Sequence, residues 1–221
     1  MRGPVPAIAG EEINALLARL RNEARIDIAR AGTPDAADAA GIIVEFLPRR
    51  QMQELVPNAA CFVVPRVAGW EEFRAHRRSA RIDWTTLTER ERVTVFAPSD
   101  VSPQEVRDCL HEELAQALGP LNDIYRLADS VFNDDNFHTV LTGFDMLVLR
   151  VTYAPELRSG MRREDVAARL PAILARLNPR GEGIGSAGAA DPTPREWITA
   201  IETALGARSA PGDRRAAALR A

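Results

Sequence analysis

The sequence contains no lysine. All 28 basic residues are arginine, which fits either a need for planar guanidinium groups in recognition or the coding bias of the source. We take coding bias as the default explanation. The formal net charge is only -3, and charges of both signs are interspersed, so the strong positive field that attracts proteins to nucleic acid is missing. We therefore expect no nucleic-acid partner.

Long hydrophobic runs are missing too. The longest apolar stretches, residues 42–47 and 61–67, are far too short to cross a bilayer, so we expect no membrane span. Residues 1–10 are rich in proline and glycine, which predicts a flexible lead-in. They contain no apolar core of the length found in secretory signals, so the chain is either cytosolic or numbered from a mature, processed start.

Cysteine is scarce. The two cysteines, Cys61 and Cys109, fall on a predicted strand and on the predicted central helix. They could meet in the fold as a disulfide or remain as two buried thiols. The residues alone leave both possibilities open.

The hydrophobic patterning that is present predicts an α+β protein. Pro65 places one strand at a sheet edge or on a bulge, because proline cannot donate to a ladder, and Pro171 predicts a break in a helix. We expect strands at residues 26–29, 41–47, 61–67 and 92–97, and helices at residues 11–24, 49–56, 103–118, 143–153 and 161–177.

Between two of these strands, we expect residues 69–91 to form a helical or irregular excursion. It contains Trp70, Phe73 and Trp84. These aromatic side chains could line a ligand groove, but large aromatics more often anchor a long loop to the core. We favour the anchoring role.

The domain organisation follows from these elements. We expect one main domain at residues 11–180, a linker of small residues at 181–192 and a helical tail at 193–221. The last helical pattern has no stop signal. We therefore expect the tail to be the first part of a longer helical array.

The helix at residues 103–118 has clear boundary signals. Ser102 is a predicted N-cap, Pro103 occupies the first helical position, and Glu105 completes a capping box. Gly119 followed by proline ends the helix. A second capping signature, Thr142 with an aspartate three residues later, precedes residues 143–153.

The central helix has the frame of a zinc-protease helix without its histidines. Such a helix places two metal ligands one turn apart, with a glutamate next to the first as general base. If His111 is taken as the first ligand, Ala115 and Leu121 fall on the other two positions, which leaves a single ligand. That register cannot hold zinc.

A register shifted by one residue gives a more specific resemblance. Residues 112–119, Glu-Glu-Leu-Ala-Gln-Ala-Leu-Gly, resemble the H-E-x-G-H-A-L-G motif of the metzincin zinc peptidases. Residues 130–132, Ser-Val-Phe, resemble the S-V-M of the methionine turn, and residues 141–153 resemble the start of the following helix. The resemblance implies a metzincin-like, or zincin-like, α+β fold, in which a small mixed twisted sheet packs against the long active-site-type helix 103–118 and flanking helices.

The resemblance also assigns positions in the site. It puts Glu113 on the general-base position, Glu112 and Gln116 on the first two ligand positions, and Asn122 on the third. All three ligand positions therefore hold oxygen donors, whereas zinc sites prefer imidazole or thiolate. We expect no zinc.

A site of this composition has two further interpretations. It could hold calcium or another hard cation, or it could be a hydrogen-bonded polar cluster without a metal, which we favour because polar residues in a fold usually satisfy one another. The residues expected around it are His111, Asp123, Asp134, Asp135 and His138. His111 lies about 100° around the helix from its neighbour Glu112, so we expect it to be a neighbour rather than a ligand.

A second resemblance covers more of the chain. Residues from about 13 to 178 are similar to an uncharacterised bacterial family of exported domains, which carries the E-E-L-A-Q-A-L-G and F-N-D-D motifs in this same form. This resemblance implies a periplasmic or secreted location, and with it a disulfide between Cys61 and Cys109.

These observations predict a non-catalytic binding or scaffold domain. Its groove, between the central helix and an edge strand, would hold a peptide, a protein partner or a cell-envelope component by strand addition. The alternative is a hydrolase with Glu113 as general base, Glu112 or Asp123 as its partner, and a non-standard metal or none. A third interpretation is a scaffold module that acts through its helical tail.

Overall fold

The computed structural model of this chain describes residues 1–33, 35, 36, 39–121, 124, 127, 130–133, 140–181, 199 and 203. Most of the predicted linker (181–192) and nearly all of the predicted helical tail (193–221) lie outside the described residues. In the described part of the chain, every helix is too short or too polar to cross a membrane.

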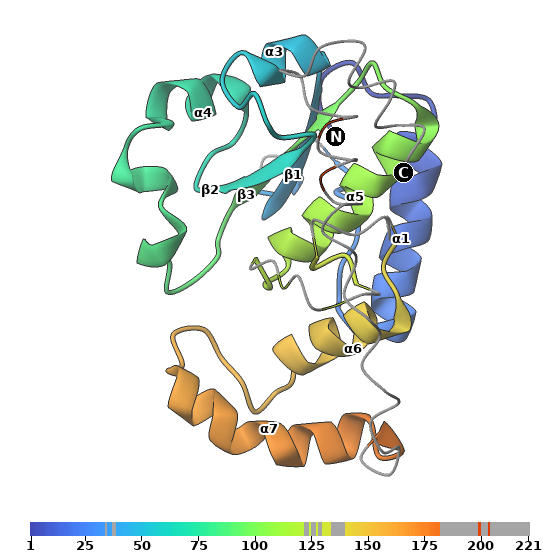
Figure 1. Cartoon of the computed structure of the whole chain (residues 1–221), viewed down its shortest axis with the longest axis vertical. Coiled ribbons are helices and arrows are strands. Elements are labelled where there is room, and N and C mark those ends of the chain that lie inside the picture. Colours follow the sequence, from blue (N-terminus) through green and yellow to red (C-terminus); the bar gives the residue numbers. More distant parts are fainter. Residues whose placement is uncertain are drawn as a thin grey trace.

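The centre of the fold is a three-stranded mixed sheet (Figure 1). Its strands are β1 (Ile42–Leu47), β2 (Phe62–Pro65) and β3 (Val93–Pro98), in the order β1-β3-β2. The central strand β3 pairs parallel with β1 and antiparallel with β2, and all of its residues are buried. The prediction from Pro65 is confirmed, because β2 is an edge strand.

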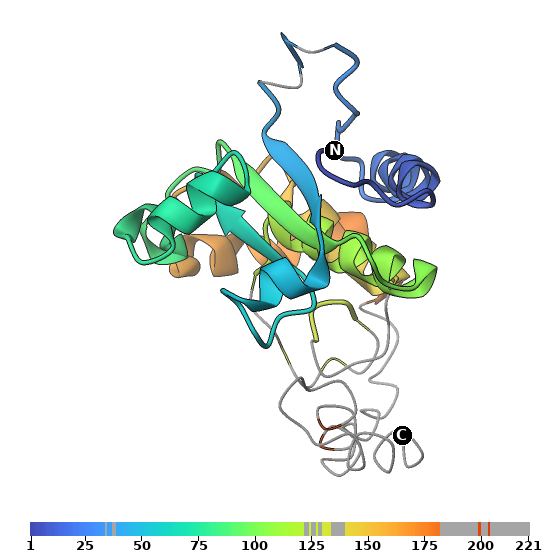
Figure 2. The ribbon, with the colours of Figure 1, turned by 90° about the horizontal axis from the view of Figure 1, so that it is seen from above.

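Helices pack on both faces of this sheet. Residues Val93, Val95 and Ala97 of β3 point into the main core, whereas Phe96 points into a second, smaller cluster with residues of α3 and α4. Figure 2 shows α1 nearly end-on at one side of the sheet and α4 at the other. The helices are α1 (Ala9–Glu23), α3 (Arg49–Gln53), α4 (Trp70–His76), α5 (Pro103–Ala117), α6 (Gly143–Thr152) and α7 (Arg163–Leu177).

The long helix α5 begins where the sequence predicts. The Ser102 hydroxyl accepts from the Glu105 amide at 3.2 Å, and the Glu105 carboxylate accepts from the Ser102 amide at 3.3 Å, which completes the capping box. The helix then packs against α1 and against β2 and β3 of the sheet. The α+β class and the small mixed sheet are therefore confirmed.

Two predicted details of secondary structure are wrong. Residues 26–29 form no strand, because Arg25 takes a left-handed conformation (φ 60) after α1 and Ile26 instead folds back into the core. Helix α7 runs through Pro171 without a break. Pro171 and Ala167, whose carbonyl the proline leaves without its helical donor, are both exposed, so water can satisfy that carbonyl.

The lead-in of residues 1–10 contacts the sheet. The Arg2 amide donates to the Val44 carbonyl at 2.9 Å, and the Phe46 amide donates to the Arg2 carbonyl at 3.0 Å. Gly3 has a φ of 79, and a Cβ there would lie 2.1 Å from the Phe46 carbonyl oxygen. Only glycine fits this close approach, which places the chain beside β1.

Candidate functional site

A cleft lies between α5 and the edge strand β2. Its volume is about 710 Å³, and three residues of the predicted site, Glu112, Glu113 and Gln116, line it from the helix side. Cys61 and Val63 line it from the strand side. The spacing that puts Glu112 and Gln116 on the first two predicted ligand positions thus places both side chains in one cleft, together with that of Glu113.

Two carboxylates meet in this cleft. One oxygen of Glu112, one oxygen of Glu113 and the Cys61 sulfur all lie within 4.8 Å of one another. The Glu113 side chain is almost fully buried, with 3% exposure. Because the sulfur belongs to a disulfide, it cannot act as a thiolate ligand, and the oxygen donors that remain suit a hard cation better than zinc.

Several predicted site residues cannot be placed. Asn122, the third ligand position, lies outside the described residues. The same holds for the expected neighbours Asp123, Asp134, Asp135 and His138. The geometry of the candidate site therefore rests on Glu112, Glu113 and Gln116.

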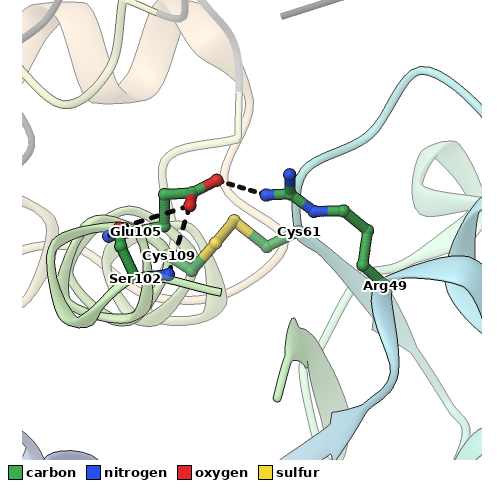
Figure 3. The surroundings of a disulfide bond; sticks show 5 residues. All are labelled: Arg49, Cys61, Ser102, Glu105 and Cys109. Atoms are coloured by element: carbon green, nitrogen blue, oxygen red, sulfur yellow. Dashed lines mark hydrogen bonds and ion pairs between the residues drawn. A yellow bond between two sulfur atoms is a disulfide. The ribbon is translucent and has the colours of Figure 1, made fainter. Parts of the chain in front are cut away.

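A disulfide joins the two walls of the cleft. Cys61, just before β2, is bonded to Cys109 in α5, with their Cα atoms 5.8 Å apart (Figure 3). An ion pair between Arg49 and Glu105 adds a second link between the sheet side and the start of α5. The disulfide implied by the family resemblance is confirmed, and it ties the chain at the start of β2 to α5.

The edge strand β2 directs backbone groups away from the sheet. The Arg66 amide donates to the Arg92 carbonyl at 2.8 Å, which marks these opposed residues as a hydrogen-bonded pair. Such pairs alternate along an antiparallel ladder, so the N–H and C=O groups of Val63 point away from β3. Val63 also lines the cleft, so its amide and carbonyl are placed to pair with an added strand.

The aromatic residues of the excursion divide between two roles. Trp70 and Phe73 pack in the smaller core cluster, as expected for anchoring residues. Trp84, in the short 3-10 helix Trp84–Thr86, lines the cleft instead, and the Arg90 guanidinium lies 5.2 Å above its ring. No sequence signal distinguished Trp84 from the other two.

His111 lies in the protein core rather than in the cleft. Its side chain is 6% exposed, and its Nδ1 accepts from the Leu141 amide at 3.1 Å, which links α5 to the chain before α6. Burial, with the nearby positive charge of Arg19, lowers the pKa of His111 to about 4, although Glu12 opposes the shift. The imidazole is therefore neutral at pH 7 and has a structural role.

Acid is expected to destabilise the protein through His111. Between pH 6.5 and 4 the unfolded chain binds a proton on this imidazole that the folded chain excludes, so the free energy of unfolding falls by up to about 3 kcal/mol as the pH falls. His111→Asn keeps an acceptor for Leu141 and does not titrate. Urea unfolding of both proteins across this range should show a weaker pH dependence for the variant; parallel curves would contradict the prediction.

A second buried carboxylate organises the segment beside the site. Asp145 is fully buried; its Oδ1 accepts from the Ser130 hydroxyl at 2.6 Å and its Oδ2 from the Val131 amide at 3.3 Å. It also forms the capping box of α6 with Thr142. Asp145 thus connects residues 130 and 131 to the start of α6.

Comparisons with known proteins identify a family but no activity. Neither a search of curated proteins nor a search of solved structures gave a match. The model of the family described as "Protein of unknown function (DUF2927)" matches residues 1–172, a range that includes the sheet, α5 and the described lining of the cleft. The chain belongs to this uncharacterised family.

Proposed function

We propose that this chain is a non-catalytic binding domain, and that its cleft holds an extended segment of a partner protein as an added strand beside β2. The observation that carries the proposal is the position of Val63, whose outward N–H and C=O groups lie on the cleft wall opposite Glu112 and Gln116. Main-chain bonds to β2 would supply affinity. The carboxylates would select the side chains of the bound segment.

The position of the cleft supports this mode of binding. It lies between the antiparallel edge strand β2 and helix α5, so an added strand would run along β2 and face the helix. In the register predicted from the sequence, Glu112 and Gln116 occupy the first two ligand positions of the helix, where a zinc peptidase has histidines. Among the described residues the cleft lining contains no imidazole and no thiol, which favours binding over zinc-dependent hydrolysis.

The disulfide supports a cell-envelope location for this domain. Disulfides persist in oxidising compartments such as the periplasm and are rare in the cytosol. Cys61 and Cys109 are both used in the bond. The ligand that we propose is therefore an extended segment of a partner protein in the same compartment.

Alternate N-methylation of a bound peptide tests strand addition. Peptides would be selected from a random library on the purified chain, and each amide of the best binder would then be N-methylated in turn. An added strand bonds β2 through every second residue, so methylation should weaken binding at alternate positions only. Uniform tolerance along the peptide, or failure to select any peptide, would overturn the proposal.

Two variants of Val63 locate the binding edge. Val63→Pro removes the outward amide without interrupting the β2–β3 ladder and should weaken peptide binding by about tenfold or more. Val63→Ala keeps the amide and loses only packing, so it is the matched control. Equal affinities of the two variants would show that the peptide does not use this edge.

A hydrolase remains a second candidate because of the carboxylate pair. Glu112 and Glu113 present oxygens within 4.8 Å of each other in the cleft, an arrangement that paired carboxylates use for acid-base work. Metal analysis of the purified chain separates the candidates. One zinc per chain would overturn the binding proposal, and hydrolysis of a selected peptide that Glu113→Gln abolishes would establish the second candidate.

A further inference from the structure

A second cavity lies on the other side of the α5 C-terminus, away from the cleft lining. It is a groove of about 800 Å³ between the end of α5, the start of β3, and the α6–α7 hairpin that Figure 1 shows beyond that end. This volume falls in the range of roughly 300–1,000 Å³ that small-molecule sites occupy. We call it the α6–α7 groove.

The walls of the α6–α7 groove are largely aliphatic. Ile42 and Leu118 contribute from the core side, and Met161, Val166 and Leu170 contribute from the hairpin side. Helix α7 buries only Ile173 in the described structure, and Val166 and Leu170 stay half-buried at the groove. An apolar chain laid along this wall would remove hydrophobic surface from water.

The groove has a cationic end formed by Arg90. Its guanidinium donates to the carbonyls of Gln116, Ala117 and Gly119 at 2.8–3.1 Å, which stabilises the C-terminus of α5. Three of its five N–H groups are thereby used. The buried Nε has no hydrogen-bond partner, and no carboxylate of the described residues forms an ion pair with Arg90.

The other polar groups at this end are Tyr153 and Arg158. The Tyr153 phenol is protonated at neutral pH and can donate, and burial raises its pKa further although the nearby positive charge of Arg90 opposes the shift. Among the described residues that line the groove, Arg158 adds a second positive charge, and the exposed Glu89 is the one acid. The charge at the groove is therefore positive, and the half-buried Arg90 and the more exposed Tyr153 and Arg158 stand next to an aliphatic wall.

We infer that the α6–α7 groove binds an anionic amphiphile, an aliphatic-chain carboxylate whose head group lies against Arg90 and Tyr153 and whose chain runs along α7. The head group complements the positive charge that the described protein leaves without an acidic partner. The chain covers the half-buried aliphatic wall. This site is separate from the cleft beside β2 and does not depend on the function proposed there.

Calorimetric titration with decanoate and decan-1-ol tests both parts of this inference. The two probes share a chain length and differ in charge. The full chain should bind decanoate about tenfold or more tightly than the alcohol, because only the carboxylate makes charge-assisted bonds. Equal affinities, or no binding of decanoate, would overturn the inference.

Variants of the cationic end and of the wall separate the two contributions. Tyr153→Phe should weaken decanoate by about fivefold and leave the alcohol unchanged, and Arg90→Gln should reduce the preference for decanoate over the alcohol to near one. Val166→Trp fills the groove and should abolish binding of both probes. Ala167→Trp, its exposed neighbour outside the lining, is the matched control.

Two results would assign the groove differently. Binding that Val166→Trp leaves intact would place the probes elsewhere and overturn the inference. Self-association of the chain that Val166→Trp abolishes, without decanoate binding, would mean that a second copy covers the groove. Because Tyr153 is 48% exposed, its variant keeps the test valid even if Arg90→Gln unfolds the end of α5.

Discussion

Replacing Cys61 and Cys109 together by alanine is expected to lower the free energy of unfolding by about 4 kcal/mol. The disulfide spans a sequence separation of 48, and closing a loop of this length removes much of the conformational entropy of the unfolded chain. Alanine is the better substitute because Cys109 is 3% exposed, and serine would bury a hydroxyl there. This effect is large beside the whole stability of an ordinary domain.

Urea and thermal unfolding measure this loss. The midpoint temperature should fall by roughly 10 °C for a chain of this size. The parent protein unfolded in the presence of a dithiol reductant is the control and should give the same value as the variant. A loss below about 1 kcal/mol, or a parent protein that the reductant leaves unchanged, would contradict the prediction.

The disulfide also matters for the cleft. β2 has only four residues and pairs with the sheet on one side, so its position against α5 depends on the bond from Cys61. Without that bond the strand can move away from Glu112 and Glu113. We therefore expect the alanine variant to bind a strand-adding peptide more weakly even at temperatures where it remains folded.

The elements whose boundaries depend on local chemistry could be predicted from the sequence. Ser102 with Glu105, and Thr142 with Asp145, mark the starts of α5 and α6 because each capping box is formed within four residues. Pro65 indicated an edge strand for an equally local reason. In the two capping boxes the side chain that gives the signal makes the contact, and Pro65 acts through its own missing N–H.

The features that could not be predicted depend on tertiary contacts. Ile26 has the β-branched character of a strand residue, but its place is decided by the core cluster beyond α1. Arg2 pairs with Glu45 of β1, which is distant in the sequence, and no local sequence pattern indicates this pairing. Trp84 and Arg90 reach the cleft and the α6–α7 groove because a long excursion folds back on α5. Tertiary packing determines the positions of these residues and outweighs their local secondary-structure propensities.

The candidate site could be predicted in part because helical geometry is local. Glu112 and Gln116, one turn apart, face the same cleft, and His111 points into the core as its rotation about the helix requires. The disposition of Cys61 near the two carboxylates could not be inferred, because it depends on where β2 pairs.

Replacing Asp145 by alanine is expected to lower the free energy of unfolding by about 4 kcal/mol, far more than the loss of an ordinary helix cap. The carboxylate is fully buried, and besides the Ser130 and Val131 bonds it accepts from the Thr142 amide at 2.7 Å and hydroxyl at 3.0 Å. Its removal would leave several buried donors without an acceptor. The turn at residues 130–133 and the start of α6 would lose their connection together.

The equivalent position of α5 provides the matched control. Glu105 has the same place in its capping box, but its side chain is 42% exposed, and water can satisfy the groups that it leaves. Glu105→Ala should therefore cost about 1 kcal/mol, although it also removes the ion pair with Arg49. Urea unfolding of the two variants measures the contrast. Equal losses would show that Asp145 acts only as a local cap, and that the turn at residues 130–133 does not depend on it.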